Sequence, residues 1–256
     1  MSHSLLTLVR DLRLRRGRER RGLALAEGVR LVEEALAAGI AIRHVLASPS
    51  LEATPRGSAL TAALKAGGHA VEVLEGREFD QLAATEHPQG VLAVVEPRRW
   101  QLADIKVTPR TPVLVLDGVQ DPGNVGTMIR SAFSLGAAGL IALPGTAEFT
   151  NPKTLRATMG GLFRLPCVNL DEPAFQAWTT SSGVRVVLAA TGGAPLGSIR
   201  GTPLALIVGN EGTGTRPSLD GWVDGRIGIP LRDGAESLNV SVAAGILLFE
   251  ITRGGE

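Results

Sequence analysis

Short, uninterrupted apolar runs in the second half of the chain constrain its fold more than any other feature. The runs at 113–116, 140–143 and 204–208 contain no polar residue, so strands formed from them would be buried on both faces. Segments with helical periodicity separate the runs, and buried strands that alternate with helices form a parallel sheet with helices on both faces. The sequence therefore predicts an α/β fold.

Further elements of the same kind complete this half of the chain. We expect strands at 184–189 and 227–229 and a helix at 124–135. The last helix is expected at 238–252, where Val240, Ala243, Ala244, Leu247 and Ile251 form one apolar face.

The first part of the chain alternates between strand-like and helical segments on a smaller scale. Residues 97–111 hold two prolines, mixed charges and no sustained period, which is typical of a linker. The sequence therefore predicts a small α/β domain at 1–96, a linker at 97–111 and a larger domain at 112–256.

Positive charge is concentrated near the N-terminus, although the formal net charge of the whole chain is only +1. Between residues 10 and 21, seven arginines stand against Asp11 and Glu19, which leaves a local excess of five positive charges. Such a cluster either neutralises nucleic-acid phosphates or forms a solvated helix face, and charge alone does not separate the two. The candidate RNA-binding residues are Arg13, Arg15, Arg16, Arg18, Arg20 and Arg21.

Several classes of protein are excluded by simple features. Arginines occupy the region where a signal peptide needs apolar residues, and no apolar run is long enough for a membrane span. The single cysteine, Cys167, is expected to be a small buried residue, and the four histidines show no metal-ligand spacing. We therefore expect a cytoplasmic protein without membrane or metal.

Three segments, 117–130, 206–214 and 229–241, follow predicted strands, and open parallel sheets bind ligands beyond the carboxyl ends of their strands. Gly209 and Gly214 have the spacing of a phosphate loop, but Thr215 stands where that loop needs lysine. No dinucleotide-binding glycine fingerprint is present either. A ligand with an adenosine moiety and no phosphates, such as S-adenosylmethionine, meets these constraints.

The same three segments closely resemble the three motifs of the SpoU family, within the SPOUT superfamily of knotted methyltransferases. The first motif is matched by Asn124 and Arg130, and the second by the turn at 209–212. The third is matched by Ile229-Pro230 and by Ser237-Leu238-Asn239 before the last helix. The resemblance covers about residues 113–256, in the order and approximate spacing of the family.

This resemblance implies an RNA 2′-O-ribose methyltransferase that uses S-adenosylmethionine, with a C-terminal trefoil knot and a homodimeric assembly. The implied catalytic residues are Asn124, Arg130, Glu211, Ser237 and Asn239. The implied cofactor-binding residues are Gly209, Ile229 and Leu238, to which Thr191 and Gly192 are added because they follow a predicted strand.

Each proposed role has a structural alternative. Arg130 is otherwise a surface arginine, and because guanidinium stays protonated we expect it to anchor phosphate and stabilise the forming alkoxide. Asn124 is expected to cap its helix, and Ser237 and Asn239 have the alternative role of helix-start residues. Glu211 has the alternative of an ordinary turn carboxylate.

The N-terminal part is similar to the L30e-like substrate-binding domain that is often joined to SpoU catalytic domains. The stretch 16–28 and the helix around 32–36 carry this likeness. It favours large-subunit ribosomal RNA as the substrate, with transfer RNA second. A non-catalytic RNA-binding assembly factor and a dinucleotide-dependent enzyme are the competing functions.

Overall fold

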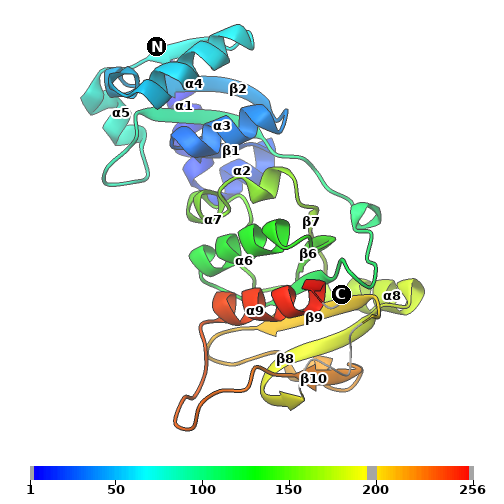
Figure 1. Cartoon of the computed structure of the whole chain (residues 1–256). Helices are drawn as coiled ribbons and strands as arrows, with labels where there is room; N and C mark the ends of the chain where they lie inside the picture. The colour runs from blue at the N-terminus through cyan, green and yellow to red at the C-terminus, as the bar shows by residue number, and fades with distance from the viewer. Residues whose placement is uncertain (1–2, 195–200, 254–256) are drawn as a thin grey trace. The chain divides into compact units, whose positions relative to one another are not determined.

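In the computed structural model, which describes residues 3–194 and 201–253, the chain folds into two compact units (Figure 1). Unit 1 comprises Met1–Arg99 and Thr150–Arg164, and unit 2 comprises Trp100–Phe149 and Leu165–Glu256. Most of the expected linker is therefore part of unit 2, where Ile105 is buried in the core beside Val113. None of the helices in the described ranges is long and apolar enough to cross a membrane.

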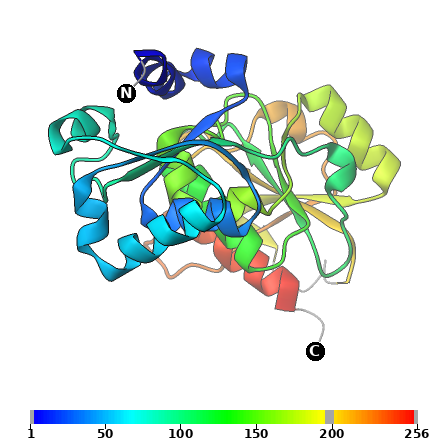
Figure 2. The same cartoon turned by 90° about the horizontal axis from the view of Figure 1, so that it is seen from above.

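Unit 1 contains a mixed four-stranded sheet with helices on both faces. Its strands, in spatial order, are β1 (Ala24–Glu27), β4 (Val91–Glu96), β2 (Ala41–Ala47) and β3 (Val71–Val73). The helices are α1 (His3–Arg13), α2 (Arg15–Arg21), α3 (Val29–Ala37), η1 (Pro49–Ala53), α4 (Pro55–Ala66) and α5 (Gly76–Leu82). Side chains of α1 and α5 pack on one face of the sheet, and α3 contacts β1, β2 and β4 from the other, with α4 beside it (Figure 2).

A segment from the second half of the sequence completes unit 1. It holds α7 (Pro152–Ala157) and the short helix η3 (Gly161–Phe163). The Arg156 guanidinium lies 3.6 Å from the Glu27 carboxylate, which is almost fully buried, and Arg164 donates a 2.6 Å hydrogen bond to Glu34. Burial of a carboxylate such as Glu27 requires partners, and Ala84 and Thr85 also donate to it.

Unit 2 is built on a six-stranded sheet in which every neighbouring pair of strands is parallel. The spatial order is β10 (Gly225–Ile227), β8 (Arg185–Ala194), β9 (Leu204–Gly209), β5 (Val113–Asp117), β6 (Gly139–Ala142) and β7 (Cys167–Asn169). The predicted parallel sheet is thus confirmed, and Cys167 is buried in it as expected.

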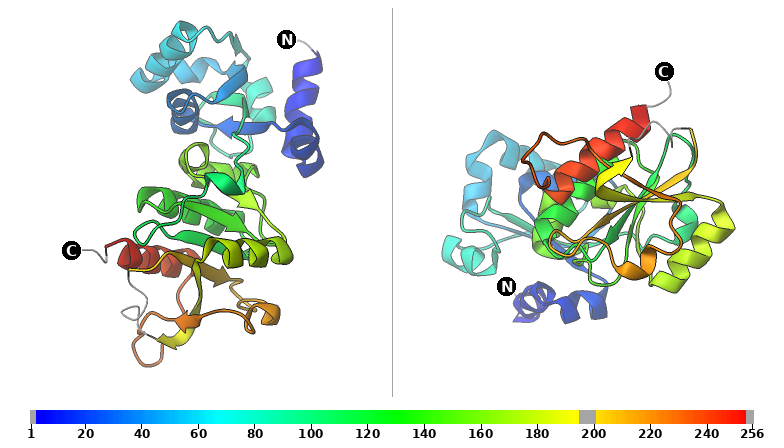
Figure 3. Two further views of the ribbon diagram at one scale, coloured as in Figure 1. Left: turned by 90° about the vertical axis from the view of Figure 1, so that its right-hand side faces the viewer. Right: turned by 90° about the horizontal axis from the view of Figure 1, so that it is seen from below.

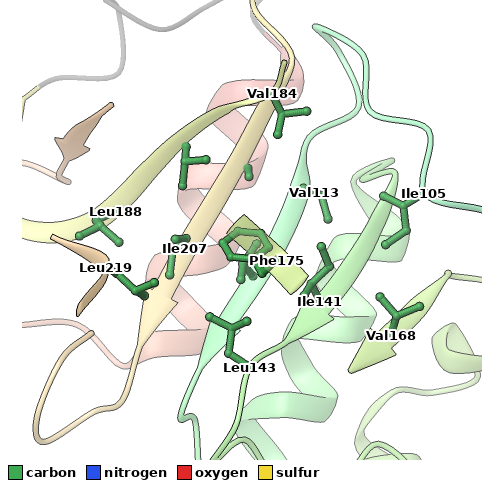
Figure 4. Packing of buried hydrophobic residues seen from close by; sticks show 13 residues of the cluster. Ile105, Val113, Ile141, Leu143, Val168, Phe175, Val184, Leu188, Ile207 and Leu219 are labelled. Atoms are coloured by element: carbon green, nitrogen blue, oxygen red, sulfur yellow. The ribbon is translucent and has the colours of Figure 1, made fainter. Parts of the chain in front are cut away.

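Helices cover both faces of this sheet. On one face, Phe175 of α8 (Glu172–Ser182) and Leu219 of η5 (Pro217–Leu219) pack on alternate strand residues (Figure 4). On the other face, α6 (Pro122–Ser134) and α9 (Val240–Arg253) lie side by side (Figures 1 and 3). The short helix η2 (Leu102–Asp104) precedes β5.

Some boundaries differ from the sequence prediction for identifiable reasons. Helix α6 begins at Pro122 because Asp121, not Asn124, caps it, and proline fits the first helical position. Helix α9 begins at Val240, after its cap Asn239, so Leu238 lies outside it. Strand β8 extends to Ala194, β10 ends at Ile227, and the three-residue strand β7 was not predicted.

Candidate active site

Three loops meet at the carboxyl edge of the unit 2 sheet. Strands β8, β9 and β5 are neighbours, and Asp117 at the end of β5 pairs in register with Gly209 at the end of β9. The loops that follow β5 and β9 therefore start side by side. With the stretch 228–239, the loop after β9 encloses a cavity of about 630 Å³, which is the size of a small-molecule site.

Backbone segments approach each other closely at and beside the cavity wall. A Cβ atom on Gly209 would lie 2.4 Å from both Gly214 C and Thr215 N, so the loop after β9 folds back tightly against the strand end. Similarly, a Cβ atom on Gly193 would lie 2.4 Å from the carbonyl carbon of Ile227. Glycine at such positions permits a close approach of backbone segments. A larger residue at Gly209, which lines the cavity, would therefore displace part of the wall.

The structure brings together most of the predicted cofactor-binding residues. Thr191, Gly209, Ile229 and Leu238 all line the cavity. Gly192 is not among the described lining residues; it lies within β8, is exposed and has a φ of 73°. Thr191 also lies inside β8 and not after it, because that strand is longer than predicted.

Three predicted catalytic residues form a hydrogen-bonded network at the cavity. Asn124 Nδ2 donates to Glu211 Oε1 over 2.6 Å, and Asn239 Nδ2 donates to Asn124 Oδ1 over 3.2 Å. Glu211 and Asn239 lie 87 and 115 residues after Asn124 in the sequence. Glu211, Ser237 and Asn239 line the cavity, so the network places polar groups at its wall.

Of Asn124 and Asn239, only Asn239 caps a helix. Asp121 caps α6 by accepting from the Asn124 N–H over 2.9 Å, so the expectation that Asn124 is the cap is wrong. The side chain of Asn124 is therefore left for Glu211 and Asn239. Asn239 does cap its helix, because Oδ1 accepts from Ser241 N over 2.9 Å. Its Nδ2 group remains directed at Asn124.

Arg130 is not brought to the cavity within one chain. It lies on α6 six residues after Asn124, which corresponds to about 9 Å along a helix. It is exposed, and no hydrogen bond or ion pair joins it to another residue in the described ranges. Four large apolar side chains are exposed on α6 and α9, which pack against each other, and we call this set the α6–α9 face. Its members are Phe133, Val242, Ile246 and Phe249.

Two residues of the site were missed by the sequence analysis. The Asp117 carboxylate is buried at the end of β5, where Oδ1 accepts from Arg216 Nε over 2.6 Å and Oδ2 accepts from Arg216 N over 2.7 Å. Arg216 also donates to the Pro144 carbonyl over 2.7 Å. An aspartate that ends an otherwise apolar strand was the available signal, because such a charge needs a partner.

The arginine-rich helices of unit 1 divide into structural and exposed side chains. Arg18 is buried and donates to the Leu12 and Arg13 carbonyls over 3.0 and 2.8 Å, so its predicted RNA-binding role is replaced by a structural one. Arg13 donates to the Ala83 carbonyl. The Arg18 bonds therefore join α2 to the end of α1, and the Arg13 bond attaches α1 to the residue after α5.

The remaining arginines are exposed at the surface of unit 1. Arg20 and Arg21 pair with Asp11 over 2.8 and 2.6 Å, and the Arg21 hydrogen bond, with Arg20, lowers the pKa of the Asp11 carboxyl. Arg15 pairs with Glu19 over 2.6 Å. Arg16 has no ion pair or hydrogen bond with any residue that the structure describes.

Comparison with known proteins identifies the family of this arrangement. The sequence model of the SpoU rRNA Methylase family matches residues 111–249, which contain the cavity and all three site loops. The chain belongs to the SpoU family. A second model, the MRM3-like substrate binding domain, matches residues 6–93.

Relatives of this SpoU protein match along nearly its whole length. The 23S rRNA (guanosine(2553)-2′-O)-methyltransferase RlmP of Bacillus subtilis is 35% identical, over 94% of this chain and 93% of that protein. The 23S rRNA (adenosine(1067)-2′-O)-methyltransferase of Streptomyces laurentii is 31% identical, over 90% and 85%. The crystal structure of an AdoMet-bound rRNA methyltransferase from Sinorhizobium meliloti is 31% identical, with a TM-score of 0.85, over 98% of this chain and 95% of that one.

Proposed function

We propose that this protein transfers a methyl group from S-adenosylmethionine to a ribose 2′-hydroxyl of 23S ribosomal RNA. The Asn124–Glu211–Asn239 network at the wall of the cavity is the observation that carries the proposal. Full-length relatives named as 23S rRNA 2′-O-methyltransferases support the substrate.

The cavity fits the proposed cofactor in size and chemistry. Its volume of about 630 Å³ exceeds what one nucleoside requires, and its wall combines backbone groups at Gly209 and Ile229 with the apolar side chain of Leu238. Peptide groups suit the hydrogen-bonding edge of adenine, and an apolar side chain suits its faces. S-adenosylmethionine would supply a methyl group activated by its positive sulfur.

The residues around the cavity would orient the attacking ribose and assist the loss of its 2′-hydroxyl proton. Amide and carboxylate groups fixed by mutual hydrogen bonds are already oriented before substrate binds, which lowers the entropic cost of alignment. Arg130 would hold the adjacent phosphate and stabilise the developing alkoxide. Because guanidinium does not release its proton, the hydroxyl proton passes to phosphate or water.

A homodimer would supply the missing Arg130. The α6–α9 face exposes four large apolar side chains, each between 39% and 50% accessible, and apolar patches of this kind mark interfaces. Arg130 lies on α6 three residues before Phe133 of this face, so pairing of two faces places Arg130 of one copy near the other copy. The proposed dimer would thus bury these apolar side chains and also complete the active site.

Two further features of the family belong to this proposal. We expect the stretch 225–239 and α9 to thread a trefoil knot, which is supported by the return of α9 to pack against β9 and α6. Unit 1 would be an L30e-like RNA-binding domain, supported by the substrate-binding family match and by the exposed arginines Arg15, Arg16, Arg20 and Arg21. Ribosomal RNA as substrate implies a cytoplasmic location.

The experiment is transfer of labelled methyl from S-adenosylmethionine to purified ribosomal and transfer RNA, with the unaltered protein beside Arg130→Ala. Ribose-methylated 23S RNA with the unaltered protein and none with the variant is the expected result. Label on transfer RNA alone would overturn the substrate. Bound cofactor without transfer to either RNA would favour the non-catalytic RNA-binding alternative.

A further inference from the structure

The loop that carries Glu211 has little regular structure of its own. Residues 210–214 form a tight turn in which Asn210 N donates to Gly214 O over 2.9 Å, and Gly214 N donates back over 3.0 Å. These two bonds define the shape of the turn. They do not define where the turn lies relative to α6, although the 2.6 Å contact between Glu211 and Asn124 depends on that position.

The first anchor of this turn is the side chain of Asn210. Its Nδ2 group donates to the Gly118 carbonyl, in the loop that leads into α6, over 2.9 Å. Its Oδ1 atom accepts from Gly212 N and Thr213 N over 2.8 and 3.2 Å. One amide therefore organises the turn with its oxygen and attaches it to the neighbouring loop with its nitrogen.

The second anchor is the ion pair at the other end of the turn. Asp117 directly precedes Gly118, and its buried carboxylate binds both the backbone N–H and the Nε group of Arg216. The paired geometry of guanidinium and carboxylate fixes orientation as well as distance. Arg216 Nη2 also donates to the Pro144 carbonyl, so three hydrogen bonds hold this residue.

We propose that Asn210 and Arg216 are positioning residues of the methyl-transfer site, which together hold the 210–216 loop against the loop that leads into α6. This two-point latch sets the distance between the Glu211 carboxylate and the Asn124 amide. The inference rests on the proposed function. Neither residue needs to touch substrate, because both act by fixing the position of Glu211.

Asn210→Asp tests the first anchor with minimal change. The variant keeps an oxygen for Gly212 N and Thr213 N but places a carboxylate where Nδ2 donated to the Gly118 carbonyl. A misplacement of about 1 Å at a reacting group costs up to about 100-fold, so we expect kcat to fall about 10- to 100-fold. Asn210 is itself one of the residues that line the cavity, but its Nδ2 group is bound to the Gly118 carbonyl. The affinity for S-adenosylmethionine should therefore change less than about threefold, because the variant retains the turn.

Asn169→Asp is the matched control for Asn210→Asp. Asn169 is exposed at the end of β7, at the far edge of the same sheet, so this variant adds the same charge without touching the latch. Its kcat should equal that of the unaltered protein. Arg216→Lys tests the second anchor with charge retained, and the expected result is again a lower kcat with preserved cofactor affinity.

Two outcomes would overturn the latch. The first is unchanged kcat in folded Asn210→Asp and Arg216→Lys. The second is a fall in cofactor affinity as large as the fall in kcat, which would mean that the two side chains act by binding the cofactor and not by positioning Glu211. If the unaltered protein methylates no RNA, the proposed function fails, and amide hydrogen exchange decides the latch separately. Arg216→Lys should then speed amide hydrogen exchange at residues 211–213, and an unchanged exchange rate would refute the latch.

Discussion

Replacement of Gly209 by alanine tests whether close backbone contact shapes the proposed cofactor cavity. The added methyl group would lie 2.4 Å from Gly214 C and from Thr215 N, and both atoms belong to backbone that cannot rotate away. The loop must therefore move by about 1 Å to restore ordinary contact distances near 3.5 Å. Gly209, Gly214 and Thr215 all line the cavity, so this movement changes the binding surface itself.

The expected magnitude follows from overpacking. Inserting a methyl group into a closely packed site costs about 1–3 kcal/mol, which in a domain of this size lowers the thermal midpoint by about 2–4 °C for each kcal/mol. Affinity for S-adenosylmethionine should fall about 10- to 100-fold, which corresponds to about 1.4–2.8 kcal/mol of binding free energy.

Gly221→Ala is the matched control, because a Cβ atom at Gly221 meets nothing within 4 Å and its backbone conformation is open to other residues. Thermal unfolding and calorimetric titration with S-adenosylmethionine should distinguish the two variants. If Gly209→Ala binds the cofactor as tightly as Gly221→Ala does, the cavity is not shaped by this contact and the reasoning is refuted.

Three further predictions concern other parts of the molecule. Ile246→Asp, on the α6–α9 face, should yield monomers by sedimentation and abolish methyl transfer, and an active monomer would contradict the proposed dimer. Arg18→Ala should lower the free energy of unfolding by about 2–4 kcal/mol because two charge-assisted hydrogen bonds are lost, whereas Arg16→Ala should leave stability unchanged and weaken RNA binding. Burial raises the pKa of the Cys167 thiol, so a thiol reagent at pH 8 should modify it only as the protein unfolds, and rapid labelling of folded protein would disprove its burial.

The sheet of unit 2 was predictable because burial on both faces leaves a direct mark on sequence. The runs at 113–116 and 204–208 became β5 and β9 almost residue for residue. Strand β7 was missed because three residues at a sheet edge carry too short a pattern to distinguish from a loop. The burial of Ile105 within the predicted linker was not predictable, because this residue is isolated among polar residues and is buried only by packing on the core.

The candidate site was predictable in its members but not in their connections. Motif resemblance named Asn124, Glu211 and Asn239, but it did not show that Asp121 accepts from the N–H of Asn124 and caps α6, whereas Asn239 caps α9. The partnership of Asp117 with Arg216 spans 99 residues, and no local pattern encodes a contact of that separation. Motif resemblance also named Arg130, but the structure shows no residue in the described ranges bound to it.

Unit 1 is made from two stretches of sequence, and this limits how it can be exchanged between relatives. A recombination that transferred only residues 1–99 would leave behind α7, with Arg156, the partner of the buried Glu27, and Arg164, the partner of Glu34. The incoming unit would then need a recipient whose residues 150–164 already match it. The two units should consequently have diversified together, as one inherited block, and chimeras should fold only when both stretches come from the same parent.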